Sequence, residues 1–425
     1  MGRDSTRWQS LTFVMGLVVA FVACESLTPS PDPSGSGEPP SAGPTEFGLR
    51  TPFGTMRPPV TEPPGTTRPT PPPNPTYWTR VADMAEPRER HAAAMLPDGR
   101  VMVIGGQSIF RDPDGTGRDY AQLGSTEIFD PATGTWTAGP PLRDPRDDHD
   151  ALALPDGRIL VGGGSVSSVE IFDPETNRWS RIAELPERHL WDTGTLLADG
   201  RILVIGRTGR DDPHEVAASI FDPAAATWTA TARTELLWFG HGTALLGDGT
   251  VLVVGGSPVG VHVPEGQRSA AIYSPTTDRW RDVGPMPGIA FAPRVTLLGD
   301  QWAIVMRSGV EGGAATFLYD SKDRTWSAAP HWGDDPFQYP ETAITLADGR
   351  AMVHDDFPGL VHVFEPATGT WSDLGPFMEL TSVPFSLLPD GRVLVAGGYH
   401  GCLDHNPCAA GEIAEAWLFD PAGGG

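Results

Sequence analysis

The sequence predicts an all-β protein, a seven-bladed β-propeller with four-stranded blades whose ring is closed by the N-terminal strand of the folded region. Two segments recur in alternation, one with Asp-Gly between apolar runs and the other with an aromatic-Asp-Pro turn followed by Trp. Successive copies of that Trp lie about 43 to 58 residues apart, a spacing typical of propeller blades. The 51 glycines and 44 prolines among 425 residues agree with a fold rich in turns.

The N-terminal segment has the pattern of an export signal. Two arginines precede an uncharged run from 11 to 23, which fits the apolar core of a signal peptide and is too short to span a bilayer. The run ends in Phe-Val-Ala-Cys at Cys24, which resembles the bacterial lipobox apart from Phe21. We therefore expect residues 1–23 to be a signal peptide and Cys24 to be lipidated, which anchors an exported chain in the bacterial cell envelope, facing outward. Secretion without a lipid and an uncleaved anchor are the alternatives.

The segment after Cys24 is expected to be a stalk. Between 25 and 76 the chain has sixteen prolines, many Ser, Thr and Gly, and almost no side chains that could form a core. Such a chain is disordered or partly polyproline II, and it reaches roughly 160 Å when fully extended. Residues 24–76 would thus hold the folded region, 77–421 with a tail at 422–425, clear of a membrane. A proline-rich ligand for another domain is the alternative interpretation.

The first recurring segment is predicted to be a β-hairpin. From Leu96 to Gly106 an Asp-Gly pair separates two apolar runs, and glycine supplies the positive φ that a tight hairpin turn requires. Two glycines end the second run, where we expect them to let neighbouring chains approach closely. Copies lie at 156–163, 199–206, 248–256, 348–353 and 390–398, with a degenerate copy at 299–302. The degenerate copy lacks the glycine pair, yet the run from Trp302 to Met306 still predicts a buried strand in the fifth blade.

The second recurring segment, from Glu127 to Trp136, is predicted to form the two outer strands of each blade. Its other copies centre on Phe172, Phe221, Tyr273, Tyr319, Phe364 and Phe419. We expect the tryptophans to pack between blades. The last copy has no Trp, whereas Trp78 has no such turn before it. Residues 77–81 are therefore predicted to complete the seventh blade and close the ring.

These repeats resemble kelch repeats, which carry paired glycines after the second strand and a spaced aromatic residue and Trp in the third and fourth strands. Over 77–421 the chain is similar to bacterial kelch-repeat lipoproteins and to the propeller of galactose oxidase. The resemblance implies a module that binds a protein or a polysaccharide. It does not include the copper site of the oxidase, which needs a linked Cys-Tyr pair and an added C-terminal domain, so we expect no metal and no cofactor.

Binding is expected on the face of the ring where the b–c and d–a connections emerge, with the strands of each blade named a to d from the axis outward. The long b–c loops are 107–125, 207–217, 257–269 and 399–415. The opposite face carries the short Asp-Gly and Asp-Pro turns. Long loops on a rigid scaffold are a common place for recognition. We call the first surface the loop face and the second the turn face.

Candidate site residues lie in the d–a loops of the loop face. Seven residues before the hairpin aspartate, most blades carry His or an acidic residue at the start of the innermost strand, while the fifth and seventh carry Pro293 and Val383. Candidates for acid–base catalysis are His91, His149, His241 and Glu341. Candidates for ligand binding are Arg88, Arg90, Arg146, Arg188, Trp191, Asp192, Trp238, Arg294, Trp332 and Tyr339. Arginines bind carboxylates and aromatic rings stack on sugars, so an anionic glycan would suit them. Hydrogen bonds of the histidines to neighbouring blades, direct ligand contact and a metal site remain as three interpretations.

Two cysteines lie in the last b–c loop. Cys402 and Cys408 are expected to form a disulfide, because the chain is expected to be exported. A reactive thiol, or a metal pair beside His400 and His405, is the alternative.

The charge balance limits the partners. With 30 basic and 54 acidic residues, the net charge of −24 leaves no cationic footprint for nucleic acid. The favoured function is a monomeric, surface-anchored module that touches the membrane only through its lipid and binds a protein or a glycan. A carbohydrate isomerase (mutarotase or epimerase) or lyase using the candidate His and Glu side chains is one alternative, and a purely structural envelope protein is another.

Overall fold

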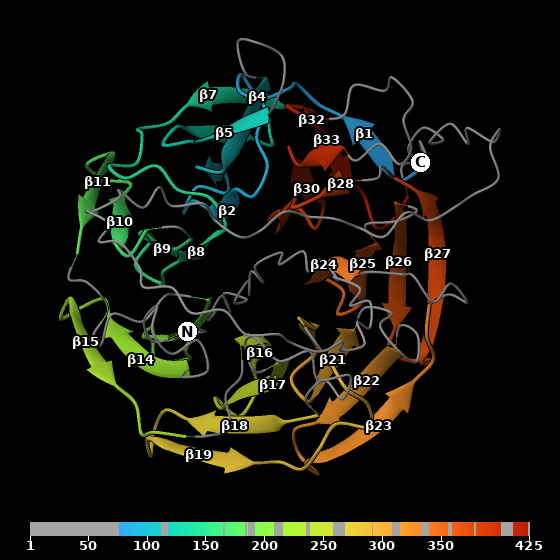
Figure 1. Ribbon diagram of the computed structural model, residues 1–425. Coiled ribbons are helices and arrows are strands. Elements are labelled where there is room, and N and C mark those ends of the chain that lie inside the picture. The colour runs from blue at the N-terminus through green and yellow to red at the C-terminus, as the bar shows by residue number, and fades with distance from the viewer. Residues whose placement is uncertain are drawn as a thin grey trace, which may run out of the picture. The chain divides into compact units, whose positions relative to one another are not determined.

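The computed structural model describes residues 76–423, apart from 112–117, 165, 183–184, 186–191, 208–215, 235–238, 258–267, 291, 308–314, 333–339, 356–358, 378–379 and 401–410. The described residues form strands and turns and contain no helix, so none of them belongs to a helical membrane span. Seven four-stranded antiparallel sheets follow one another around a ring (Figure 1). The predicted seven-bladed propeller is confirmed.

The first four blades follow one another directly along the chain. Blade 1 contains β2 (Ala92–Met95), β3 (Val101–Ile104), β6 (Thr126–Asp130) and β7 (Thr135–Ala138). Blade 2 contains β8 (His149–Ala153), β9 (Ile159–Gly163), β10 (Glu170–Asp173) and β11 (Arg178–Arg181). Blade 3 contains β12 (Thr193–Leu196), β13 (Ile202–Arg207), β14 (Val216–Asp222) and β15 (Thr227–Ala230). Blade 4 contains β16 (Phe239–Leu245), β17 (Val251–Ser257), β18 (Ala270–Ser274) and β19 (Arg279–Asp282).

The last three blades include the one that closes the ring. Blade 5 contains β20 (Arg294–Leu298), β21 (Trp302–Arg307), β22 (Ala315–Asp320) and β23 (Thr325–Ala329), which confirms the buried strand predicted at Trp302. Blade 6 contains β24 (Pro340–Thr345), β25 (Ala351–Asp355), β26 (Leu360–Glu365) and β27 (Thr370–Pro376). Blade 7 contains β29 (Phe385–Leu387), β30 (Val393–Ala396), β33 (Ala416–Phe419) and, as its outermost strand, β1 (Trp78–Arg80).

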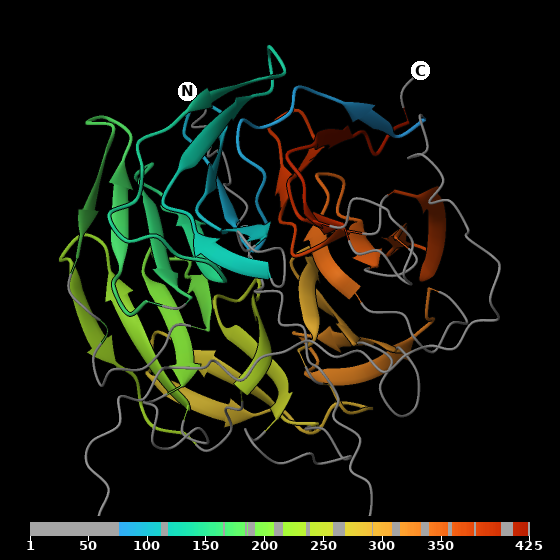
Figure 2. The same cartoon turned by 45° about the horizontal axis from the view of Figure 1, so that its top comes forward.

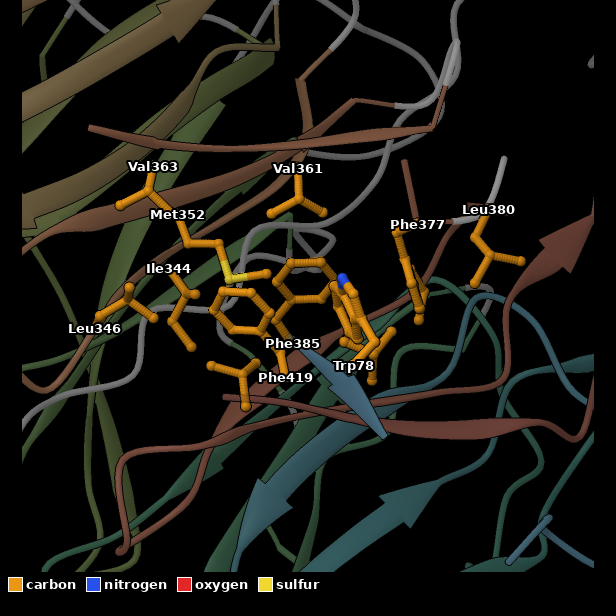
Figure 3. Close-up of a cluster of buried hydrophobic side chains, with 13 residues drawn as sticks. Trp78, Ile344, Leu346, Met352, Val361, Val363, Phe377, Leu380, Phe385 and Phe419 are labelled. Atoms are coloured by element: carbon orange, nitrogen blue, oxygen red, sulfur yellow. The ribbon is translucent and has the colours of Figure 1, made fainter. Parts of the chain in front are cut away.

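The ring is closed by pairing between the two ends of the folded region. Trp78 lies opposite Phe419, the same register that joins Phe129 to Trp136 in blade 1. Blue β1 and red β33 lie side by side in both views (Figures 1 and 2). Trp78 is 4% exposed, and its ring stacks 3.7 Å from that of Phe377 in a cluster that joins blades 6 and 7 (Figure 3). The prediction that residues 77–81 complete the seventh blade is therefore confirmed.

The recurring tryptophans join neighbouring blades, as predicted. The ring of Trp179 packs on Phe172 of its own blade, with centroids 5.2 Å apart. Its indole Nε1 donates a hydrogen bond of 2.9 Å to the carbonyl of Pro140, in the loop that leaves blade 1. Trp136, Trp280 and Trp371 bond the preceding loop in the same way. Each of these tryptophans therefore connects its own blade to the loop that comes from the preceding blade.

Two of the predicted b–c loops contain strands of their own. In blade 1, β4 (Gln107–Arg111) and β5 (Arg118–Gln122) form a hairpin on the loop face. In blade 7, β31 (Tyr399–His400) and β32 (Gly411–Glu412) join β28 (Leu380–Thr381) in a three-stranded sheet. Strands β4 and β32 contact each other. The loop face is therefore built up above the boundary between blades 7 and 1.

Candidate functional site

Backbone hydrogen bonds link the blades at the loop-face ends of their innermost strands. In five blades the residue eight positions before the hairpin aspartate has a positive φ: Arg90 (53°), Asp148 (49°), Gly240 (69°), Ala292 (42°) and Ser382 (58°). The N–H of Arg90 donates to the carbonyl of Ser382 at 3.2 Å, and that of Asp148 donates to Arg90 at 2.9 Å. The N–H of Ala292 donates to Gly240 at 2.9 Å. We call this arrangement the rim belt. Because a left-handed backbone costs a residue with a side chain about 1–2 kcal/mol, the surrounding ring must hold these positions.

Blade 6 joins the rim belt through a side chain. Pro340 stands at the belt position, and proline has neither an N–H nor access to a positive φ. The N–H of Ser382 donates instead to Oε1 of Glu341 at 2.8 Å. The backbone carbonyl of Glu341 accepts a hydrogen bond of 2.5 Å from Nε of Arg294, whose Nη2 lies 3.8 Å from the carboxylate. The predicted site residues Arg294 and Glu341 are both buried, and their contacts tie blades 5, 6 and 7 together.

The three candidate histidines are buried between blades. His91, His149 and His241 stand at the start of strands a in blades 1, 2 and 4, with exposures of 5%, 6% and 3%. Cε1 of His149 lies so close to Gly105 that a β-carbon added to this glycine would approach it to 2.9 Å. Nε2 of His241 lies 2.8 Å from Oγ1 of Thr193 in blade 3. The histidines therefore pack against the preceding blade, while the structural, ligand-binding and metal interpretations of them stay predictions.

Burial also controls the ionisation of two of these histidines. It lowers the pKa of His91 to about 3, and the positive charge of Arg88 adds to the shift. It lowers the pKa of His149 well below its usual value, with Arg146 adding in the same direction. Both rings are neutral at pH 7, since desolvation and a nearby cation each disfavour the charged form. Catalysis by His91 or His149 stays a prediction, but neither ring titrates near neutrality as an acid–base role there would require.

Two of the predicted ligand-binding arginines form buried ion pairs. Nη2 of Arg88 lies 3.1 Å from Oε1 of Glu127, and Nη2 of Arg146 lies 3.1 Å from Oε1 of Glu170. Both guanidinium groups are fully buried, and both also donate to backbone carbonyls of strand c or its approach. The glutamates in turn accept N–H groups of the d–a loops. These contacts attach each d–a loop to its blade, and ligand binding by Arg88 and Arg146 stays a prediction.

Arg90 and Asp148 differ from these pairs because they are partly exposed. Nη1 of Arg90 donates to Oδ2 of Asp148 at 2.8 Å, and the side chains are 32% and 23% exposed. Burial raises the pKa of Asp148 to about 6; Arg90 opposes the shift, whereas the charges of Asp147 and Glu341 add to it. Because Glu341 belongs to blade 6 and Asp148 to blade 2, the carboxylates interact across the ring. The sequence analysis included Arg90 but missed Asp148, a polar group that a ligand can reach.

Asp192 and Trp332 are buried at the starts of blades 3 and 6. Asp192 accepts hydrogen bonds from the backbone and side chain of Arg207, the last residue of β13. Nε1 of Trp332 donates to Oδ2 of Asp355 at 2.8 Å, and the same oxygen lies 3.3 Å from Nε2 of His362. The sequence analysis missed this last pair, although Asp355 stands where most blades carry the first glycine of the glycine pair.

The remaining candidates lie outside the described residues, and their roles stay predictions. They are Cys24, Arg188, Trp191, Trp238, Tyr339, Cys402 and Cys408. Within the part of the chain that the structure describes, no group of three or more His, Cys, Asp or Glu side chains is arranged to hold a metal ion.

Comparisons with known proteins agree with this architecture. Residues 156–186, in blade 2, match the family described as the Kelch motif. An F-box/kelch-repeat protein of Arabidopsis thaliana is 37% identical over 87 residues, so the match spans 20% of this chain and 20% of that protein. A fungal alcohol oxidase of the AA5 family, solved in complex with copper, has a TM-score of 0.61 at 16% identity, covering 82% of this chain and 77% of that chain. At this identity the likeness shows the fold alone. The chain is thus a seven-bladed β-propeller that contains a kelch motif.

Proposed function

We propose that the protein is a surface-anchored binding module that contacts a protein or polysaccharide partner through its loop face. The observation that carries the proposal is the β4–β5 hairpin, which extends this face beyond the blades. It presents Tyr120 at 56% exposure, the one exposed large hydrophobic side chain among the residues described. Of the described strands, only β4 pairs with β5, so the outer edge of β5 is available for contact. Exposed aromatic side chains are common anchors of binding interfaces.

A protein partner has the stronger support. Kelch propellers commonly mediate protein interactions, and residues 156–186 carry that motif. A polysaccharide remains within the proposal because the candidate residues include arginines and aromatic rings. The turn face has only short connections, such as 173–178 in blade 2, and so offers less surface for a partner.

The test compares variants of the two faces. The wild-type protein, Tyr120→Ser, a variant in which a tight turn replaces 109–120, and Glu175→Ser on the turn face are used for affinity capture from envelope extracts and on glycan arrays. We expect a ligand whose binding falls at least tenfold in both loop-face variants and is unchanged in Glu175→Ser. A confirmed ligand that binds all four proteins equally would show that the binding face is wrongly assigned.

The anchor is proposed on the sequence alone, from the apolar run at 11–23 and the lipobox-like Cys24. We expect the wild-type protein to fractionate with membranes and Cys24→Ser to leave them, since the lipid supplies the membrane affinity. Retention of Cys24→Ser in the membrane fraction would instead favour an uncleaved anchor.

A further inference from the structure

Blades 5 and 6 differ from the others at the loop-face end of strand b. Seven residues after the hairpin aspartate, five blades carry a glycine, which a second glycine follows in all of them except blade 3. These residues are Gly105, Gly163, Gly206, Gly255 and Gly397. Blade 5 carries Arg307 at this position and blade 6 carries Asp355. Two adjacent blades therefore have a charged side chain where the other five have a glycine.

The glycine position matters because it faces the next blade closely. A β-carbon added to Gly105 would approach the carbonyl oxygen of Arg146 to 2.7 Å, and one added to Gly397 would approach that of Arg88 to 2.8 Å. In blade 5 the backbone runs on as regular strand to Arg307, which pairs with Ala315. Arg307 is thus the last residue of β21, at the root of the b–c loop, and it belongs to the loop face.

Arg307 is a buried cation for which the described residues provide no partner at Nε or Nη1. Its side chain belongs to a residue only 6% exposed, and Nε and Nη1 are buried without a hydrogen-bond partner among the described residues. Burial alone acts on its pKa, which it lowers. By contrast, Arg146 lies 3.1 Å from Glu170 and is bonded to the backbone of its blade. The charged residue of blade 6 is also engaged, since Asp355 accepts a hydrogen bond from Trp332.

An unpaired buried guanidinium is costly for the folded protein, because it has lost its water without gaining an acceptor. Buried polar groups of this kind are rare in native proteins and require an explanation. The planar donor fork of arginine matches a carboxylate, which can accept two parallel hydrogen bonds. The net charge of −24 opposes the approach of a polyanion, whereas a single carboxylate on a partner meets Arg307 at short range.

We propose that Arg307 is an anion subsite of the loop face that receives the carboxylate of an Asp or Glu side chain of a protein partner. The inference rests on the proposed function, since it adds a chemical requirement to the same face. The ligand carboxylate supplies the acceptor that the described residues do not provide at Nε and Nη1. Arg307 is therefore a specificity residue: it destabilises the free fold and discriminates acidic from amide side chains in the complex.

The first test needs no ligand. Arg307→Met keeps the length and the apolar stem of the side chain and removes the unpaired charge. We expect it to raise the midpoint of thermal unfolding, whereas the control Arg294→Met, which breaks the contacts with Glu341, lowers it. If Arg307→Met lowers the midpoint as much as Arg294→Met, Arg307 has a structural partner and the proposal is wrong.

The second test measures recognition on an array of acidic peptides, each printed beside a copy with Asn for Asp and Gln for Glu. The wild-type protein should prefer the acidic member of a pair roughly 10- to 100-fold, the range for a charged hydrogen bond, and Arg307→Met should lose that preference. Equal binding of acidic and amide peptides by the wild type, a preference that survives in Arg307→Met, or binding to no peptide would each overturn the proposal. A uronate glycan that binds the wild type but not Arg307→Met would support recognition of a carboxylate, but it would show that the carboxylate comes from a glycan and not from a protein partner.

The two proposals fail in different ways. If the variant lacking 109–120 loses binding while Arg307→Met retains the acidic preference, the subsite is wrong and the loop face stands. If neither variant changes binding of a confirmed ligand, the loop face itself is wrong.

Discussion

Arginines on the loop face have three different environments in the structure. Arg88 and Arg146 are fully buried and paired, Arg90 is partly exposed at the rim belt, and Arg307 is buried with no partner at Nε or Nη1 among the described residues. The positions of Arg88, Arg90 and Arg146 could be predicted from the repeat, but a residue's place in a repeat does not by itself give its burial or the direction of its side chain.

One signal in the sequence does identify the buried pairs. Only blades 1 and 2 have Arg ten residues before the hairpin aspartate, at Arg88 and Arg146. The same two blades alone have Glu two residues before the aromatic residue of strand c, at Glu127 and Glu170. This joint occurrence matches the contacts that the structure shows between them. Comparing the repeats of one chain with each other can therefore identify arginines that form buried ion pairs.

At the residue scale, Asp148 makes the stability of the fold depend on pH. Its pKa is raised from 3.8 to about 6, so the folded state holds the proton more tightly than the unfolded state. Stability from this group is present below pH 4 and is lost as the pH rises through 6. We expect the unfolding free energy of the wild type minus that of Asp148→Asn to fall between pH 4 and 7, by up to about 3 kcal/mol. Denaturant unfolding at several pH values measures this difference, in which all other titrating groups are common to both proteins. A difference that is constant over this range would contradict the raised pKa.

At the element scale, the hairpins were the most predictable part of the molecule, because Asp-Gly and its aspartate act locally. Oδ1 of Asp98 accepts the N–H of Arg100, and its other oxygen accepts the side chain of Arg100. The sequence did not indicate that the arginines after the Asp-Gly pairs also donate hydrogen bonds to the next blade. Nη2 of Arg158 donates to the carbonyl of Pro223 at 2.9 Å, in the Asp-Pro turn of blade 3, and Arg392 of blade 7 reaches Pro131 of blade 1. These bonds connect residues that are distant in the chain, so they follow from the closed ring rather than from any local pattern.

Substitutions at two hairpin glycines can distinguish the cost of backbone strain from the cost of a steric clash between blades. Gly157 and Gly249 have similar positive φ values of 89° and 82°. A β-carbon at Gly157 would lie 2.7 Å from Cγ of Pro97 in blade 1, whereas one at Gly249 meets nothing within 4 Å. We expect Gly249→Ala to cost about 1–2 kcal/mol, the strain of a left-handed alanine, and Gly157→Ala to cost about 1–3 kcal/mol more, because the proline ring cannot move aside. Denaturant unfolding of both variants measures the two costs, and equal values would show that blades 1 and 2 are not closely packed on the turn face.

At the scale of the whole molecule, the ring was predicted correctly because an unmatched Trp and an unmatched turn stand at opposite ends of the folded region. The site was predicted less well. The equivalent positions of His91, His149 and His241 placed them together at one end of the innermost strands, and contact with neighbouring blades, where the structure buries them, was one of three interpretations left open. For His91 and His149 this burial depends on Gly397 and Gly105 of the preceding blade, where a β-carbon would meet the imidazole, and hence on contacts between blades rather than on any one repeat.

The closure itself can be tested by comparing Trp78 with Trp179. Both are 4% exposed and lie opposite the aromatic residue of strand c. Truncation of either to Ala should cost about 3–5 kcal/mol. However, β11 continues directly from a hairpin with β10, whereas β1 is three residues long and joins blade 7 only through β33. We therefore expect Trp78→Ala to release β1 locally and to lower the hydrogen-exchange protection of the β33 amides at least 100-fold, while Trp179→Ala leaves them protected. If the β33 amides were protected equally in both variants, the outermost strand of blade 7 would not depend on Trp78.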